Sequence, residues 1–354
     1  MYTSSPLLIY GAYGYTGALV VREAVAAGLR PVLAGRDASA LAALATPLGL
    51  TWRAAALDDA PALDAALDRI GVVLHCAGPF VHTSRPMVDA CLRRSVHYLD
   101  ITGELAVFEA LAARDAEAKE RSVTLLPGVG FDVVPSDCLA AHLAQRLPTA
   151  TQLTLAFRTV GGVSRGTSTT MAETSGEGGA VRRGGRIVTV PAAFRSRMIE
   201  FAPGEHSPAV TIPWGDVSTA YHSTGIPNIE VYLAMSAAMQ RSLRVSRWLA
   251  PVLRFGPIRR RLVARARTSA AGPGESARAR GGSRLWGEAR DDEGRSVRAR
   301  LLAPEAYTLT SRTAIAAARR VLGGGVATGF LTPSLAFGAD FILEQRGVTR
   351  EDLA

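Results

Sequence analysis

Lysine is almost absent from this chain. Lys119 is the single lysine among 40 basic residues, and all the others are arginines. A short-chain dehydrogenase would need Tyr-x-x-x-Lys, but Asp115 stands four residues before Lys119. A P-loop would need Gly-Lys-Ser or Gly-Lys-Thr, which does not occur. Schiff-base chemistry would depend on Lys119, which lies in a polar stretch where we expect it to be solvated. These three classes of enzyme are therefore not predicted.

Cysteine is also scarce. Cys76, Cys91 and Cys138 show no paired spacing, which is typical of a reducing compartment and predicts a cytoplasmic protein. The six histidines form no HExxH set and the cysteines form no CxxC set, so no metal site is predicted. Val321–Ala339 carries no charge, but its glycines and Pro333 predict a glycine-rich loop rather than a membrane-spanning helix.

Acidic residues are scarce in segment 241–300. The net charge of the whole chain is +9, and this segment accounts for it. Segment 241–300 holds 16 arginines and five acidic residues, an excess of 11, so the remainder is near −2. Within 241–270, nine arginines and no acidic residue alternate with apolar residues, which predicts a basic amphipathic helix broken near Gly256-Pro257. A solvated helix face, a docking face for an acidic carrier protein, and peripheral attachment to a membrane surface are all open interpretations. No nucleic-acid-binding motif is present, so nucleic acid is not an expected partner.

Short apolar runs alternate with amphipathic stretches through the first third of the chain. This pattern is typical of βαβ units and a parallel sheet. The expected strands are Leu7–Tyr10, Pro31–Ala34, Thr51–Leu57, Val72–Cys76, Tyr98–Ile101 and Val123–Leu126. The expected helices are Tyr15–Ala27, Ser39–Leu48, Pro61–Arg69, Thr83–Arg94 and Leu105–Arg121. Residues 1–135 are therefore predicted to form a Rossmann domain, an α/β fold with a doubly wound parallel sheet.

The pattern changes after residue 135. A helix over Ser136–Leu147 precedes several strands without regular helices between them, which predicts a mixed α+β second domain over 136–304, for substrate binding or dimerisation. A homodimer is one open alternative. The expected strands are Thr151–Val160, Arg186–Pro191, Ala209–Pro213, Asn228–Ala234, Ser283–Arg290 and Ser296–Leu302, with the last two forming a hairpin. Segment 305–354, with helices over Ser311–Leu322 and near Leu335–Gln345, is expected to pack back against the first domain.

A glycine-rich turn follows the first expected strand. Gly11, Gly14 and Gly17 stand where a dinucleotide site needs a tight turn, close approach of backbone to a pyrophosphate, and packing of a helix on the strand. The N-terminus of the following helix then directs its N–H groups and the positive end of its dipole at the phosphates. The candidate cofactor residues of this turn are Gly11, Tyr13, Gly14, Tyr15, Thr16 and Gly17.

The residues after the second expected strand indicate which dinucleotide binds. NAD sites usually place Asp or Glu about 20 residues after the glycines, where the carboxylate binds the ribose 2′-hydroxyl. This chain has Gly35 and then Arg36, whose guanidinium can bind the 2′-phosphate of NADP through charge-assisted hydrogen bonds. Asp37 follows, and we expect it to cap the next helix. The sequence therefore predicts NADP(H) as the cofactor, with Arg36 as one of its ligands.

Three further strands are expected to end in unusual residues. In open parallel sheets the ligand crevice lies beyond the carboxyl ends of the strands. The candidate cofactor residues there are Cys76, Ala77, Gly78, Pro79, Phe80, Gly103, Glu104, Phe131 and Asp132. Phe80 and Phe131 are expected to flank the nicotinamide. Asp132 is also the candidate catalytic general acid, although an aspartate that caps a turn would explain it equally well; Tyr98 and Tyr307 are alternative donors.

The motifs GAYGYTG, AGR, HCAGPF, YLDITGE and PGVGFDVVPSD, in this order, resemble the saccharopine dehydrogenase-like reductases. The nearest branch is that of the trans-acting enoyl reductases of bacterial lipid and polyketide assembly. Short segments such as 161–167, 223–228 and 306–310 extend the likeness over most of the chain. The resemblance implies an NADP-binding Rossmann domain, an inserted α/β substrate domain, and hydride transfer at the cleft between them.

Three functions are open on these grounds. The first is an NADPH-dependent oxidoreductase that reduces a C=C bond conjugated to a thioester, acting on a small-molecule or carrier-bound acyl substrate of lipid metabolism. The second is oxidation or reduction of a C–N bond, which the saccharopine branch performs. The third is a non-catalytic NADPH-binding protein that uses its basic segment to contact a partner.

A serine hydrolase is a further alternative, because Gly162-Val163-Ser164-Arg165-Gly166 matches the GxSxG nucleophile elbow and follows an expected strand. A hydrolase also needs an acid and a histidine downstream, but Asp216 and His222 lie only six residues apart. The glycine-rich turn would then have no explanation, so the hydrolase is not the predicted function.

Overall fold

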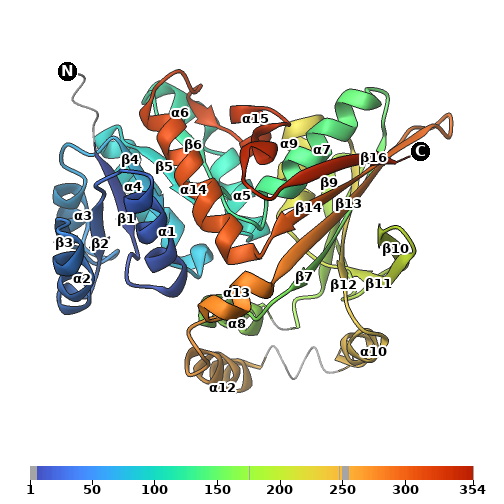
Figure 1. Ribbon diagram of the computed structural model, residues 1–354, viewed down its shortest axis with the longest axis horizontal. Coiled ribbons are helices and arrows are strands. Elements are labelled where there is room, and N and C mark those ends of the chain that lie inside the picture. Colours follow the sequence, from blue (N-terminus) through green and yellow to red (C-terminus); the bar gives the residue numbers. More distant parts are fainter. Residues whose placement is uncertain (1–5, 175, 247, 249–254, 354) are drawn as a thin grey trace. The chain divides into compact units, whose positions relative to one another are not determined.

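The computed structural model describes residues 6–174, 176–246, 248 and 255–353, which Figure 1 shows as a ribbon. The chain forms two compact units. The first comprises Met1–Val134 and Tyr307–Ala336, and the second comprises Pro135–Ala306 and Phe337–Ala354. Of the C-terminal segment expected to join the first domain, residues 307–336 belong to the first unit and residues 337–354 to the second.

The first unit contains a seven-stranded sheet in the order β15-β6-β5-β4-β1-β2-β3, and every neighbouring pair is parallel. The predicted doubly wound Rossmann sheet is confirmed. Its strands are β1 (Leu7–Tyr10), β2 (Val32–Gly35), β3 (Trp52–Ala54), β4 (Val72–His75), β5 (His97–Asp100), β6 (Thr124–Leu126) and β15 (Gly329–Phe330). The strand order reverses at β1 and β4, which is where such sheets bind their ligands.

The helices of the first unit cover a sheet whose central strands, β1, β2 and β4, are buried throughout. They are α1 (Tyr15–Ala26), α2 (Ala38–Ala45), α3 (Ala60–Ala66), α4 (Phe80–Arg94), α5 (Leu105–Ala112), α6 (Asp115–Glu120) and α14 (Ala306–Leu322), with short helices η1 (Thr46–Leu48) and α15 (Pro333–Phe337). Side chains of α3, α4, α5 and α6 share one apolar cluster with the strands. The single helix expected over 105–121 was wrong, because α5 ends at Ala112 and α6 begins at Asp115.

The second unit contains a nine-stranded sheet whose main path is β10-β11-β12-β7-β13-β14-β16, with β8 paired to β12 and to β9. Its strands are β7 (Gln152–Val160), β8 (Gly179–Arg183), β9 (Arg186–Val190), β10 (Ser196–Ala202), β11 (Glu205–Thr211), β12 (Asn228–Ala234), β13 (Gly282–Arg290), β14 (Ser296–Pro304) and β16 (Thr349–Leu353). Only β12 and β7 run parallel among these pairs of described strands, so the predicted mixed sheet is confirmed, as is the β13–β14 hairpin.

The helices of the second unit are α7 (Val134–Arg146), α8 (Arg165–Glu173), α9 (Asp216–Thr224), α10 (Ala237–Ser246), α12 (Gly256–Arg267) and α13 (Glu275–Arg280), with the short helix η2 (Phe341–Glu344). The expected lack of regular helices was wrong at α8 and α9. The helix expected near Leu335–Gln345 was also wrong, because the chain turns at Gly338, where φ is +87°. None of the described residues belongs to a helix that is long and apolar enough to cross a membrane.

Candidate functional site

Two glycines at the turn between β1 and α1 are packed too closely to carry a side chain. Gly11 has φ +78°, and a Cβ on it would lie 2.8 Å from the Cβ of Ala77. A Cβ on Gly17 would lie 2.2 Å from the carbonyl oxygen of Gly11, which is a fixed backbone atom. The N–H of Gly14 donates to that same oxygen at 3.0 Å and closes the turn. Gly11 therefore forms the tight turn and Gly17 the close packing of helix on strand that the sequence predicts for them, and the approach of Gly14 to a pyrophosphate stays a prediction.

The N-terminus of α1 offers backbone N–H groups to an anion. The N-cap is Gly14, which forms no capping hydrogen bond through a side chain, and the first turn contains no acidic residue. The first N–H groups of a helix lack acceptors within the helix, and they lie at the positive end of its dipole. The sequence thus leaves this helix end without the cap that most helices have, at the position where dinucleotide-binding folds hold a pyrophosphate.

The carboxyl end of β2 presents an arginine beside the turn. A Cβ on Gly35 would lie 2.6 Å from the Cε1 atom of Tyr13, so the tyrosine ring lies against the backbone there. Arg36 is exposed, and within the described part of the chain its side chain forms no ion pair or hydrogen bond. The side chain of Asp37 accepts from the N–H of Ala40 at 3.0 Å and caps α2, as predicted. Arg36 is thus the charged group that β2 makes accessible to a ligand.

α4 begins directly after the loop that follows β4, and a carboxylate from the loop after β5 caps that helix. Glu104 accepts hydrogen bonds from the N–H of Phe80 at 2.8 Å and of Val81 at 2.6 Å. The N-cap of α4 is Pro79, which follows Gly78 through a cis peptide bond and supplies no side-chain cap. Glu104 was predicted as a cofactor residue; these bonds give it a structural role, and contact with the cofactor stays a prediction.

A buried aspartate ties together the loops that follow β5 and β6. Asp100 is fully buried, and it accepts from the hydroxyl of Tyr98 at 2.8 Å, the N–H of Thr102 at 3.0 Å and the N–H of Gly128 at 2.9 Å. Burial raises its pKa to about 6, although these three donors act in the opposite direction. Tyr98 is therefore fully engaged in the core, which argues against it as a proton donor.

Asp132 lies over the loop that carries Glu104. A Cβ on Gly103 would lie 2.8 Å from the Oδ2 atom of Asp132, so only glycine leaves room for this carboxyl. Burial, followed by the nearby charge of Glu104, raises the pKa of Asp132 to about 7. An acid that is half protonated at neutral pH suits general acid catalysis. The structure brings Gly103, Glu104 and Asp132 together; the catalytic role of Asp132 stays a prediction.

The two phenylalanines expected beside the nicotinamide are both buried. Phe80 packs edge to face on His75, with ring centroids 5.4 Å apart. The N–H of Phe131 donates to the Oγ1 atom of Thr310 in α14 at 3.0 Å. Thr310 was not singled out by the sequence, since its only signal was a place in a short motif. Tyr307, in the same helix, meets Tyr15 edge to face at 5.1 Å and so lies beside the glycine turn.

Ser164 in the GxSxG motif serves as a helix cap. It is the N-cap of α8, and its Oγ accepts from the N–H of Thr167 at 3.2 Å. Asp216 and His222 both lie on α9, and Asp216 accepts from the hydroxyl of Ser136 at 2.9 Å. The motif therefore has a structural explanation, and the hydrolase finds no support. No group of three metal-binding side chains occurs among the residues that the structure describes.

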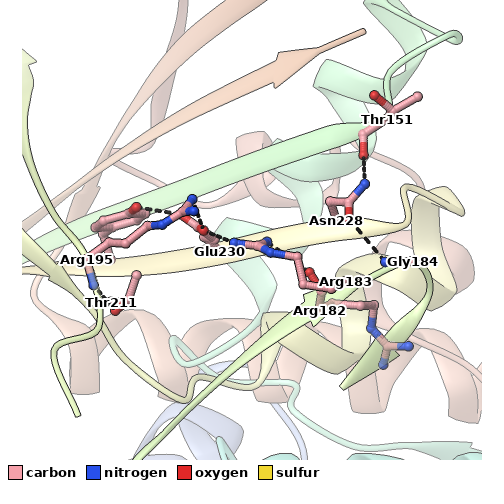
Figure 2. Close-up of polar contacts among 9 residues, drawn as sticks. Thr151, Arg182, Arg183, Gly184, Arg195, Thr211, Asn228 and Glu230 are labelled. Carbon is pink, nitrogen blue, oxygen red and sulfur yellow. Dashed lines mark hydrogen bonds and ion pairs between the residues drawn. The ribbon is translucent and has the colours of Figure 1, made fainter. Parts of the chain in front are cut away.

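The sheet of the second unit carries its own charge cluster around the buried Glu230, which Figure 2 shows. Glu230 of β12 binds the guanidinium groups of Arg183 and Arg195, the latter at 2.7 Å. Asn228, at the start of β12, donates to the carbonyl of Thr151 at 2.9 Å. Arg182 is buried, and its guanidinium lies 4.2 Å from the ring centre of Tyr221. These contacts join β12 to β8, to the loop before β10 and to the start of β7, and they join β8 to α9, so we assign them to folding.

Residues 7–126 match the family model described as saccharopine dehydrogenase NADP binding domain. They form a saccharopine dehydrogenase NADP-binding domain. The expected resemblance and the expected cofactor are thereby confirmed for this part of the chain.

The residues of the NADP-binding domain fit a dinucleotide. Its glycine turn is a cradle that a Cβ would fill, and the adjoining helix end lacks a cap. Arg36 is available to a phosphate one strand away. Gly11, Gly14 and Gly17 would therefore hold the diphosphate and Arg36 the 2′-phosphate.

Relatives with curated names share this domain. A trans-acting enoyl reductase of Mycobacterium tuberculosis is 30% identical over 148 residues, which cover 40% of this chain and 35% of that protein. A probable mitochondrial saccharopine dehydrogenase-like oxidoreductase of Arabidopsis thaliana is 30% identical over 153 residues, covering 37% and 33%. The matched regions thus span about a third of the length of these relatives.

Two solved structures share the fold of nearly the whole chain. Saccharopine dehydrogenase (L-Glu forming) from Saccharomyces cerevisiae, in its apo form, has a TM-score of 0.68 at 12% identity, covering 99% of this chain and 100% of that one. Homospermidine synthase from Legionella pneumophila, in complex with NAD, has a TM-score of 0.62 at 9% identity, covering 98% and 91%. At such low identity these likenesses show the fold and carry no further argument.

Proposed function

We propose that this protein is an NADPH-dependent oxidoreductase that reduces a C=C bond conjugated to a thioester. One observation carries the cofactor half of this proposal, namely the side-chain-free turn at Gly11, Gly14 and Gly17 with the exposed Arg36 at the end of the next strand. NADPH supplies the hydride when it is bound. The protein then has to position the acyl substrate and supply one proton, and Asp132 is the group proposed to hold that proton on its carboxyl oxygen.

The enoyl thioester is favoured over other substrates by the names of relatives that share the NADP-binding domain. Oxidoreduction of a C–N bond is the second candidate, because residues 7–126 match the saccharopine dehydrogenase NADP binding domain and one relative is named a saccharopine dehydrogenase-like oxidoreductase. The substrate is proposed to be a small or carrier-bound acyl thioester of lipid metabolism, and the site of action is proposed to be the cytoplasm.

The cofactor is tested by calorimetric titration of the purified chain with NADPH and with NADH. We expect Arg36→Ala to weaken NADPH binding about 10- to 150-fold, the value of a lost charge-assisted contact of roughly 1.5–3 kcal/mol, and to leave NADH binding unchanged. Arg22→Ala removes an exposed arginine from α1 and serves as the matched control. Equal NADPH affinity in the Arg36→Ala variant would remove Arg36 from the cofactor site.

The reaction is tested by substrate-dependent consumption of NADPH. An enoyl thioester is compared with pairs of amino acids and keto acids under the same conditions. Turnover of the thioester alone supports the proposal, and turnover of the amino acid pairs supports the second candidate. NADPH binding without consumption by either class would favour the non-catalytic alternative.

A further inference from the structure

α10 and the residue two positions beyond it expose arginine together with large apolar side chains. Arg241, Val245 and Trp248 are separated by four and three residues, which is the spacing of one helix face, and the N–H of Trp248 donates to the carbonyl of Val245 at 3.1 Å. Val245 is 61% exposed and Trp248 is 87% exposed. Gln240 is buried and donates to the carbonyl of Met235, and Arg244 donates to the hydroxyl of Ser196 at the start of β10, so other positions of α10 attach the helix to its own unit.

α12 repeats this arrangement. Ile258, Leu262, Val263 and Ala266 are half-buried on the side of α12 that packs against α8, its neighbour in Figure 1. The other positions of the helix carry exposed arginines, namely Arg259, Arg260, Arg261, Arg265 and Arg267. Phe255, the N-cap residue, is 60% exposed. None of these five arginines forms an ion pair with another residue that the structure describes.

We define the basic–apolar face as Arg241, Val245, Trp248, Phe255, Arg259, Arg260, Arg261, Arg265 and Arg267. The expected basic segment also includes residues 247 and 249–254, which lie outside the described residues. No acidic residue occurs between Glu230 and Glu275, so nothing in this stretch of sequence neutralises the arginines. A positive potential and exposed aromatic rings therefore coincide on one segment.

An anionic bilayer would bind both the positive charges and the exposed aromatic rings. Lipid headgroups supply negative charge at the surface, and the acyl boundary just below accepts an indole or phenyl ring. An acidic protein would pair with the charges of the arginines. It would not by itself explain why the tryptophan side chain is almost fully exposed. Helices that lie in a membrane interface combine arginine on the polar face with exposed Trp and Phe beside it. In this chain the exposed rings of Trp248 and Phe255 adjoin the arginines of α10 and α12, whereas the apolar side of α12 packs against α8.

We propose that the basic–apolar face docks on the surface of an anionic lipid bilayer. This inference goes beyond the proposed oxidoreductase function and does not depend on it, because the residues involved lie outside the NADP-binding domain.

The proposal is tested by co-sedimentation of the full chain with vesicles of phosphatidylcholine alone and of phosphatidylcholine with 30 mol% phosphatidylglycerol. We expect binding to the anionic vesicles only, and loss of most of that binding when salt is raised from 0.1 to 0.5 M. The triple variant Arg259→Gln/Arg260→Gln/Arg261→Gln should bind about a hundredfold more weakly, since each basic residue near such a surface contributes about 1 kcal/mol. Trp248→Ser should weaken binding severalfold.

Matched controls distinguish binding through the basic–apolar face from attraction caused by the chain's overall positive charge. Arg22→Gln/Arg69→Gln/Arg186→Gln removes the same charge from exposed positions elsewhere and should leave vesicle binding within twofold. For each variant, circular dichroism shows whether the chain is folded, and NADPH affinity shows whether the dinucleotide site is intact. Trp248 is so exposed that its replacement leaves packing intact, which keeps the test valid if the triple variant unfolds.

Three outcomes would overturn the proposal. One is equal binding to neutral and anionic vesicles, or binding to neither. Another is an equal loss of binding in the control triple variant. The third is binding to poly-glutamate as tight as binding to vesicles with no effect of Trp248→Ser, which would indicate an acidic protein partner instead. Binding and substrate-dependent consumption of NADPH test the proposed function independently of all three.

Discussion

The carboxylate of Glu104 accepts hydrogen bonds from the first two backbone N–H groups of α4, those of Phe80 and Val81. The negative charge lies at the positive end of that helix, where it is stabilising. The same charge lies near Asp132 and helps to raise the pKa of that carboxyl. One glutamate therefore connects the loop after β4, the loop after β5 and the candidate general acid.

Removing this cap should destabilise the first unit. We expect Glu104→Ala to lower the free energy of unfolding by about 1–2 kcal/mol, because two N–H groups lose a charged acceptor. Glu120→Ala, at an exposed position of α6, should change it by less than about 0.5 kcal/mol. Urea denaturation measures both values, and equal stability of the two variants would contradict the capping role.

The glycine turn should not tolerate a methyl group. Gly17→Ala would place a Cβ 2.2 Å from the Gly11 carbonyl oxygen, so α1 has to shift relative to β1. We expect NADPH binding to be lost and the melting temperature to fall by several degrees. Gly274→Ala is the control, because a Cβ there meets nothing within 4 Å. A Gly17→Ala chain that binds NADPH normally would show that the turn does not form the dinucleotide site.

His75 should make the protein sensitive to acid. Its ring is fully buried, neither ring nitrogen has a hydrogen-bond partner within the described residues, and burial lowers its pKa to about 3. The unfolded chain takes up a proton near pH 6.5 and the folded chain does not, so stability falls as pH decreases from about 6.5 towards 3.

Leucine has a similar volume and cannot be protonated, so His75→Leu should lose less stability than the parent over that pH range. Its stability at pH 8 should change little, since no hydrogen bond is lost. Denaturant midpoints measured at pH 8, 6 and 4 give the comparison. Parallel pH curves for the two proteins would show that His75 is not the responsible group.

The proposed role of Asp132 predicts a pH profile. With a pKa of about 7, the carboxyl ionises as pH rises, so turnover that needs its proton should fall about tenfold per pH unit well above pH 7. Asp132→Asn should lower turnover 10²- to 10⁴-fold, abolish this decline and keep NADPH affinity. Steady-state rates between pH 5.5 and 9 test this. Full turnover by Asp132→Asn would dismiss the residue as the acid and leave Tyr307 as the alternative donor.

Strands and helices with a clear local pattern of apolar residues were predicted well from the sequence. The strands β1 to β6 are short, mostly apolar segments, each followed by a helical pattern, and each begins within one residue of its expected start. Lys119 is also where its polar surroundings indicated, since its side chain is 59% exposed and pairs with Asp115 on the same helix. The missed strands β8, β10 and β16 each contain two or three charged residues, which interrupt any apolar run.

The sequence by itself determined the glycine turn, the uncapped end of α1, Arg36 and the Asp37 cap, because each depends on residues within a few positions of one another. Only the tertiary structure decided that Glu104 caps α4 and that Thr310 accepts a hydrogen bond from the N–H of Phe131. The same holds for Asp100, which accepts hydrogen bonds from Tyr98, Thr102 and Gly128. Most of these partners are separated by tens to hundreds of residues, and no local periodicity encodes such contacts. They form when parallel strands bring their carboxyl ends to one edge of the sheet.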